Sequence, residues 1–283
     1  MDSIFINTPN GNKISVTQFI PETIPKGLVV ISSATGVKQT LYFKIATYLE
    51  QHNFAVYTFD YSGIGASKLQ SLKKFNTSAS LWATNDLEAV IQYAKKNHTA
   101  TKLCLMGHSI GGQLIGLAPS SKEADGILLV AGQTGFWKLW SGLGKWKMCM
   151  TWYVLIPVLT KLFGYFPGKK IGASEDLPKD MALEWRTWCC SPNYLFDHVS
   201  NAEQSYSAIK CPIYSYSAQD DNYAPKVTVD WLTNQFKGQK AIRKHLIPKE
   251  VGISKIGHFG YFRSKNKASI WELFLSDIKT LTS

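Results

Sequence analysis

The chain has 283 residues, of which 45% are hydrophobic and 18% are charged. This is the composition of a globular protein, and it excludes a disordered, collagen-like or coiled-coil chain. The formal net charge is +11, from 31 Lys and Arg against 20 Asp and Glu, but only three of the cations are Arg. Because bidentate recognition of guanine and phosphate depends mostly on Arg, and no nucleic-acid-binding motif is present, we expect no nucleic-acid partner.

The cysteines and the N-terminus indicate a cellular location. The chain has five cysteines, an odd number, and no CxxC motif, which favours a reducing compartment. The start, Met1–Ile4, lacks the basic and apolar regions of a signal peptide. The longest apolar stretch, Trp152–Leu159, is too short to cross a bilayer. We therefore expect a cytoplasmic protein without a transmembrane segment.

Short apolar runs alternate with stretches of helical spacing along most of the chain, beginning with a hairpin of two strands around Pro9–Asn12. The continuous apolar runs that follow are typical of strands buried on both faces of a parallel sheet. The pattern predicts a mostly parallel sheet of eight strands flanked by helices. The predicted strands are Ser3–Asn7, Lys13–Phe19, Gly27–Ser32, Ala55–Phe59, Lys102–Met106, Gly126–Ala131, Pro212–Ser217 and Ile242–Ile247. The predicted helices are Leu41–Gln51, Leu81–Lys96, Ile110–Leu117, Val227–Gln235 and Ala268–Thr280.

The segment 133–205 breaks this alternation. It contains six of the nine tryptophans, and between Gln133 and Ser174 it has six Lys and no Asp or Glu. A connection of this length normally carries structure or function of its own, and Leu139–Phe163 has helical spacing. We predict that 133–205 is a helical cap (lid) inserted over one end of the sheet, and that 1–132 and 206–283 form the core. The lysines and tryptophans are also compatible with peripheral membrane contact.

The strongest motif is Gly107-His108-Ser109-Ile110-Gly111-Gly112, where a predicted strand ends and a predicted helix begins. A serine nucleophile must be presented on such a sharp turn, and glycines two residues before and after it leave room for the tight backbone. The N-terminus of the helix also favours an oxyanion. We predict that Ser109 is a nucleophile; the alternative is a buried serine in a tight turn.

A serine nucleophile needs a base, and in this kind of site the chain order is Ser, acid, His. His198, His245 and His258 follow Ser109. His245 lies within a predicted strand and His198 within the 133–205 segment. His258 lies in a loop with a glycine on each side, so we predict that His258 is the base.

The acid should follow the strand at Pro212–Ser217, where Asp220 and Asp221 are adjacent. Only one of the two carboxylates can face the histidine. We predict Asp221, with Asp220 as the alternative. For the oxyanion hole, we expect one N–H from Ile110 and one from the loop Ala34–Val37, and we choose Val37.

These residues resemble the α/β-hydrolase superfamily, and most closely the serine-aminopeptidase-like, monoglyceride-lipase-like branch of predicted hydrolases. The resemblance covers nearly the whole chain. It is carried by six segments, with Ala-Thr-Gly in place of the commoner His-Gly pair in the first: Ala34–Val37, Asp60–Ser67, Gly107–Gln113, Glu184–Cys189, Asp220-Asp221 and Ile256–Arg263. The resemblance implies the α/β-hydrolase fold and a Ser-His-Asp triad, and it implies that Asp60 belongs to a structural loop. Trp185 and Trp188 either line a pocket or pack the insertion, and packing is favoured.

Together, these features predict a serine hydrolase that cleaves an ester or related acyl bond of an apolar small molecule through an acyl-enzyme. The alternatives are a peptidase, thioesterase or acyltransferase on the same fold, or a non-catalytic binding protein, because fold alone does not decide activity. The sequence contains no phosphate-binding loop, dinucleotide-binding motif or metal-ligand cluster, so we expect no cofactor and no metal.

Overall fold

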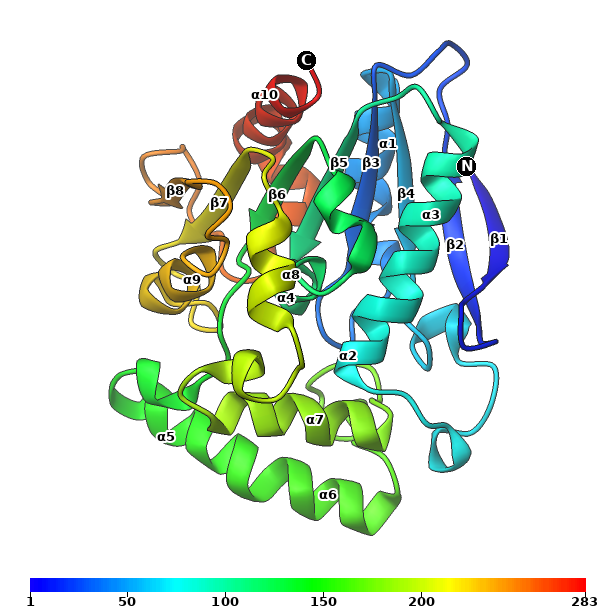
Figure 1. Ribbon diagram of the computed structural model, residues 1–283. Helices are drawn as coiled ribbons and strands as arrows, with labels where there is room; N and C mark the ends of the chain where they lie inside the picture. Colours follow the sequence, from blue (N-terminus) through cyan, green and yellow to red (C-terminus); the bar gives the residue numbers. More distant parts are fainter.

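The computed structural model describes residues 1–283 and contains one eight-stranded sheet with helices on both faces (Figure 1). The strand order is β1-β2-β4-β3-β5-β6-β7-β8. β1 and β2 are antiparallel to each other, β2 is antiparallel to β4, and all other neighbours are parallel. The strands are β1 (Asp2–Asn7), β2 (Lys13–Phe19), β3 (Gly27–Ser32), β4 (Phe54–Phe59), β5 (Leu103–His108), β6 (Gly126–Val130), β7 (Ile213–Ala218) and β8 (Ile242–Leu246). The predicted α/β architecture is confirmed.

The sheet separates two hydrophobic cores, and β3 shows why its sequence is apolar at every position. Leu28 and Val30 point into one core, whereas Val29 and Ile31 point into the other, and all four are fully buried. Successive side chains of a strand point to opposite faces. A strand covered by helices on both faces must therefore be apolar throughout.

The helices cover both faces of the sheet (Figure 1). α3 (Glu88–Asn97), α4 (Ile110–Ile115) and α8 (Ala202–Ala208) lie on one face, and α1 (Phe43–Gln51) and α10 (Glu272–Leu281) lie on the other. The remaining core helices are α2 (Ala79–Leu81) and α9 (Lys226–Thr233). The predicted helix at 81–96 is interrupted by a π-helical turn, Trp82–Leu87, which places Asp86 in the protein interior.

Within the 133–205 segment, the α-helices that precede α8 form a separate group of helices beyond one end of the sheet, whereas α8, which starts at Ala202, lies against the sheet (Figure 1). The predicted helical stretch 139–163 is α5 (Gly142–Met150), a π-helical turn (Thr151–Leu155) and α6 (Ile156–Phe163). α7 (Lys179–Cys190) lies between α6 and the sheet. None of the helices is long and apolar enough to cross a membrane.

The hydrogen bonds that attach this segment to loops at the carboxyl ends of the strands include one from its middle and one from near its start. The Glu175 N–H donates to the Gly36 carbonyl, after β3, at 2.9 Å. The Trp140 indole N–H donates to the Asn222 carbonyl, after β7, at 3.0 Å. In open α/β sheets, ligand sites form at the carboxyl ends of the strands, so the segment packs against the edge where a site is expected.

Candidate active site

Ser109 lies on the strained turn between β5 and α4. Its backbone has φ 54° and ψ −120°, a conformation that side chains other than glycine rarely adopt. The turn is held by a hydrogen bond from the Ser109 N–H to the Val130 carbonyl of the neighbouring strand (3.0 Å), and by one from the Gly112 N–H to the Ser109 carbonyl (3.0 Å). The strand, turn and helix thus present the Ser109 side chain at the sheet edge.

The glycines of the motif are required by close backbone contacts. A Cβ on Gly111 would lie 2.1 Å from the Ser32 carbonyl oxygen of β3, and a Cβ on Gly107 would lie 2.5 Å from the Gly112 Cα. Neither contact is sterically possible. The spacing of glycines around Ser109 therefore reflects how tightly α4 packs against β3 and β5.

His258 and Asp221 form an ion pair or a hydrogen bond, according to the protonation state of the imidazole. His258 Nδ1 lies 2.8 Å from Asp221 Oδ2, and the exposed fraction of these side chains is 7% and 0%. The other carboxylate oxygen, Oδ1, accepts the N–H groups of Tyr223 (2.9 Å) and Ala224 (3.0 Å). The Asp221 carboxylate is therefore held by three contacts, and it orients the imidazole.

Asp220 points elsewhere. Its carboxylate accepts the N–H groups of Ile256 (2.9 Å) and Gly257 (3.0 Å), the two residues before His258. Of the two aspartates considered from the sequence, Asp221 contacts the imidazole, and Asp220 holds the loop that carries it.

Ser109 has a different neighbour from the one expected. Its Oγ lies 3.4 Å from Gln133 Nε2, and no hydrogen bond joins it to His258. Ser109 is only 5% exposed. Catalytic hydrogen bonds are often long or poorly aligned without substrate and tighten in the complex with it.

Gln133 was not singled out from the sequence. It follows β6, where the chain leaves the sheet, and its side chain also donates to the Tyr223 carbonyl at 3.3 Å. Its Oε1 is buried without a hydrogen-bond partner, which is unusual for a buried polar atom. The sequence feature that could have indicated Gln133 as a site residue is its position shortly after a predicted strand of the parallel sheet.

The loop predicted to provide an oxyanion donor makes a tight turn. The Val37 N–H donates to the Ala34 carbonyl at 3.2 Å, and the Ala34 N–H donates to the Tyr42 hydroxyl at 2.9 Å. The N–H groups of Thr35 and Gly36 make no hydrogen bond. Ile110 is the first residue of α4, where backbone N–H groups lack acceptors within the helix.

His108, which precedes Ser109, connects two of these loops. Its Nδ1 lies 2.9 Å from the Tyr42 hydroxyl, and its Nε2 lies 2.9 Å from the His258 carbonyl oxygen. A carbonyl can only accept, so Nε2 carries the hydrogen and Nδ1 accepts from Tyr42. Burial, and secondarily the charge of His258, lowers the pKa of His108 well below its ordinary value, which keeps the ring neutral.

The other residues considered from the sequence lie apart from Ser109. His245 bonds to Ser217 Oγ (2.8 Å) and His198 bonds to Ser191 Oγ (2.5 Å). Asp60 accepts the N–H groups of Gln39 and Ala66, as expected for a structural loop. Trp188 is fully buried against Tyr194, and the Trp185 indole N–H donates to the Tyr194 hydroxyl. The two tryptophans pack the 133–205 segment, as predicted.

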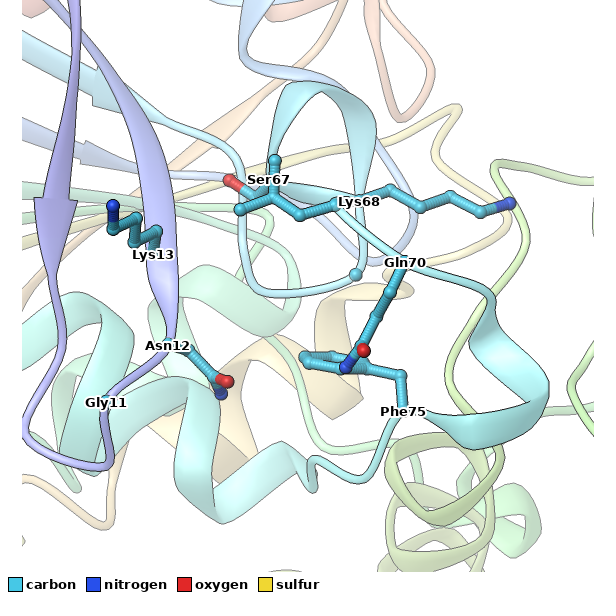
Figure 2. A pocket seen from close by; sticks show the side chains of 9 residues that line it. Gly11, Asn12, Lys13, Ser67, Lys68, Gln70 and Phe75 are labelled. Atoms are coloured by element: carbon cyan, nitrogen blue, oxygen red, sulfur yellow. The ribbon is translucent and has the colours of Figure 1, made fainter.

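Ser109 lines neither of two hollows in the protein surface. Figure 2 shows the first hollow, of about 250 Å³, which lies beside the β1–β2 turn and Phe75. None of the three predicted catalytic residues lines it. The second, of about 270 Å³, is lined by His258 and Asp220 among others. The structure contains no group of three or more His, Cys, Asp or Glu side chains arranged to hold a metal ion.

Comparison with known structures supports the fold. The chain is similar to a soluble variant of monoglyceride lipase from Saccharomyces cerevisiae (TM-score 0.71, 13% identity, 100% of this chain and 95% of that chain). It is also similar to a thermostable carboxyl esterase from Bacillus coagulans (TM-score 0.67, 14% identity, 100% and 99%). A third similar structure is the monoacylglycerol lipase of Paleococcus ferrophilus (TM-score 0.61, 14% identity, 95% and 99%). At these identities the likeness establishes the fold alone.

The sequence matches none of the curated proteins with which it was compared. A family model, "Serine aminopeptidase, S33", matches residues 23–248, which include Ser109 and Asp221 and most of the sheet. The chain therefore belongs to the serine aminopeptidase S33 family and is a serine hydrolase with the α/β-hydrolase fold.

Proposed function

We propose that the protein hydrolyses an ester or related acyl bond with Ser109 as nucleophile, His258 as base and Asp221 as orienting acid. The observation that carries this proposal is the 2.8 Å contact between His258 Nδ1 and Asp221 Oδ2, next to a serine on a strained strand-to-helix turn. His258 is linked to that turn through the hydrogen bond from His108.

In the proposed reaction, His258 Nε2 takes the proton of Ser109 Oγ as Oγ attacks the carbonyl carbon of the substrate. Asp221 holds the tautomer and stabilises the imidazolium. His258 then donates the proton to the leaving group. Water attacks the acyl-enzyme with His258 again as base, which regenerates Ser109. For this reaction the Ser109 hydroxyl must turn from Gln133 toward His258.

The oxyanion is stabilised by the Ile110 N–H and by an N–H of the loop Ala34–Val37. Val37 is the residue chosen from the sequence. Its N–H can donate to the oxyanion only if it gives up its 3.2 Å hydrogen bond to the Ala34 carbonyl. The free N–H groups of Thr35 and Gly36 require no such exchange, so we propose that one of these two donates.

Residues 133–205 act in this proposal as a cap on a core of 1–132 and 206–283. The hydrogen bonds from Glu175 to Gly36, after β3, and from Trp140 to Asn222, after β7, support this assignment. Its aromatic side chains favour an apolar acyl group, since small-molecule sites are lined mostly by such residues. The similar structures that are named as lipases and carboxyl esterases fit this substrate class.

The test is hydrolysis by wild type and Ser109→Ala of p-nitrophenyl esters, thioesters and aminoacyl amides that vary in acyl length. We expect ester hydrolysis by the wild type, and its loss in Ser109→Ala. Full activity in Ser109→Ala would refute the proposal. Preference for amides or thioesters would indicate a peptidase or thioesterase, and transfer to an added alcohol an acyltransferase. No labelling of Ser109 by a fluorophosphonate would indicate a non-catalytic protein.

We also infer a cytoplasmic location. All five cysteines are free in the structure, which fits a reducing compartment. Fractionation of cells that express the tagged chain tests this inference, and recovery in a secreted or periplasmic fraction would contradict it.

A further inference from the structure

The rod formed by α5, the π-helical turn and α6 is apolar on two opposite sides. One side is buried against the rest of the 133–205 segment and the core through Met148, Trp152, Ile156 and Thr160, which recur every four residues. Residues four apart lie on the same side of a helix. This side accounts for the attachment of the rod to the protein.

The opposite side, here called the outer face, has no partner. It carries a second apolar series, also spaced by three or four residues, and every member is exposed: Leu143, Trp146, Met150, Val154, Val158 and Leu162. The two ends of the series are the most exposed, Leu143 at 88% and Leu162 at 72%. Figure 1 shows α5 and α6 as the outermost layer at this end of the molecule.

The π-helical turn Thr151–Leu155 keeps this series together. In a regular α-helix, a four-residue spacing drifts around the axis, because a turn has 3.6 residues. The wider π turn counteracts that drift in the middle of the rod. The apolar series therefore continues along one side from Leu143 to Leu162, and contiguous exposed apolar patches mark interaction surfaces.

The charges around the outer face have one sign. Between Gln133 and Ser174 there are six Lys and no Asp or Glu. Lys147 and Lys161 lie on the rod itself and are exposed. Lys169 is the one member of the six that forms an ion pair, with Glu175 at 2.8 Å. The other five form no ion pair, and the Lys147 ammonium lies 5.1 Å from the centre of the Tyr223 ring. The segment that carries the apolar series therefore has a positive net charge.

We propose that the outer face binds the surface of a bilayer that contains anionic phospholipids. The apolar side chains would enter the boundary between headgroups and acyl chains, while the lysines pair with the headgroups. A second copy of the chain is disfavoured as occupant, because two such faces would bring like charges together. The inference concerns binding alone and does not depend on the proposed chemistry.

The test is flotation of the full-length protein with vesicles of phosphatidylcholine, with and without phosphatidylglycerol, at low and high salt. We expect binding to the vesicles that contain phosphatidylglycerol at low salt, and weaker binding in high salt because the charges are screened. Two variants should each bind these vesicles roughly tenfold more weakly than the wild type, or more weakly still. They are the apolar variant Leu143→Ser/Leu162→Ser and the charge variant Lys147→Glu/Lys161→Glu. All four side chains are exposed, so the variants should fold, as circular dichroism would verify.

Matched controls change the same residue types elsewhere on the surface. Ile24→Ser/Leu69→Ser removes two exposed apolar side chains, 88% and 57% exposed, and Lys96→Glu/Lys122→Glu reverses two exposed charges. Both should bind vesicles as the wild type does, and so should Ser109→Ala. Absence of vesicle binding, or equal effects of the outer-face and control variants, overturns the proposal. The proposal is also overturned if the outer-face variants alter only self-association of the protein, as measured by sedimentation velocity, and leave vesicle binding unchanged.

Discussion

The Nε2 atom of His108 lies 2.9 Å from the carbonyl oxygen of His258. The residue before the predicted nucleophile therefore holds the backbone of the predicted base. The same ring accepts from Tyr42, and the Tyr42 hydroxyl accepts the Ala34 N–H. A single line of hydrogen bonds thus connects the loop after β3 with the loop after β8, and it passes behind the Ser109 turn.

Tyr42→Phe breaks this line. It leaves the Ala34 N–H and His108 Nδ1 buried without partners, so we expect the free energy of unfolding to fall by about 1–3 kcal/mol. We also expect kcat for ester hydrolysis to fall several-fold with little change in KM, because His258 loses its backbone support. Denaturant unfolding and steady-state kinetics measure both effects. Tyr57→Phe is the control, since the Tyr57 hydroxyl bonds to His98; an equal loss of kcat there would contradict the role of Tyr42.

The strained backbone at Ser109 predicts an unusual stability order. Ser109→Ala keeps a side chain at φ 54°, whereas Ser109→Gly relieves the strain at the cost of some chain entropy. We expect Ser109→Gly to be about 1 kcal/mol more stable than Ser109→Ala. Urea unfolding of the two inactive variants measures the difference. The reverse order would show that the surrounding structure does not impose strain.

Substitutions of the two adjacent aspartates, Asp220 and Asp221, should have different effects on kcat. Asp221→Asn changes the partner of His258 Nδ1 and should lower kcat by about 10³–10⁴-fold. Asp220→Asn removes a charge that accepts the Ile256 and Gly257 N–H groups. It should lower stability by about 1–2 kcal/mol and affect kcat much less. If Asp220→Asn lost more kcat than Asp221→Asn, Asp220 rather than Asp221 would be the residue that orients His258.

Asp86 should make stability depend on pH. Burial, opposed in part by hydrogen bonds from Ser62, raises the pKa of Asp86 to about 7. The folded state thus retains a proton that the unfolded state releases near pH 4, so the contribution to stability is full below pH 4 and declines as pH rises to about 7. The decline is at most about 1.4 kcal/mol per pH unit.

Asp86→Asn removes this titration. Between pH 5 and 7, the free energy of unfolding of the wild type should fall more steeply with pH than that of Asp86→Asn, and above pH 8 the two slopes should agree. Chemical denaturation at a series of pH values gives both curves. Parallel curves throughout the range would show that Asp86 titrates normally in the folded state.

The strands and the Ser109 turn could be predicted because each depends on a short run of residues. Gly27–Ser32 is apolar at every position, and the Gly107–Gly112 motif combines a strand end, a tight turn and a helix start. These local signals were sufficient for all eight strands, with differences of one or two residues at their ends. They did not give the sheet order, in which β4 lies between β2 and β3, because that order depends on contacts between distant segments.

The site residues that escaped prediction act through such distant contacts. Tyr42 and His108 are 66 residues apart, and nothing near either residue indicates the other. The direction of the Asp220 and Asp221 side chains depends on the loop geometry, so the sequence supported a choice without fixing it. Val37 was chosen by its position after β3, but the turn within that loop engages its N–H and leaves those of Thr35 and Gly36 free.

The near-complete burial of Ser109 affects how tightly the protein can bind a substrate. If substrates bind only to conformations in which the 133–205 segment has moved away from Ser109, the apparent dissociation constant equals the intrinsic one divided by the fraction of molecules in those conformations. A surface that binds α5 and α6 more tightly in the open conformations would increase that fraction. Such a surface would raise the apparent affinity for substrate without touching any residue of the site.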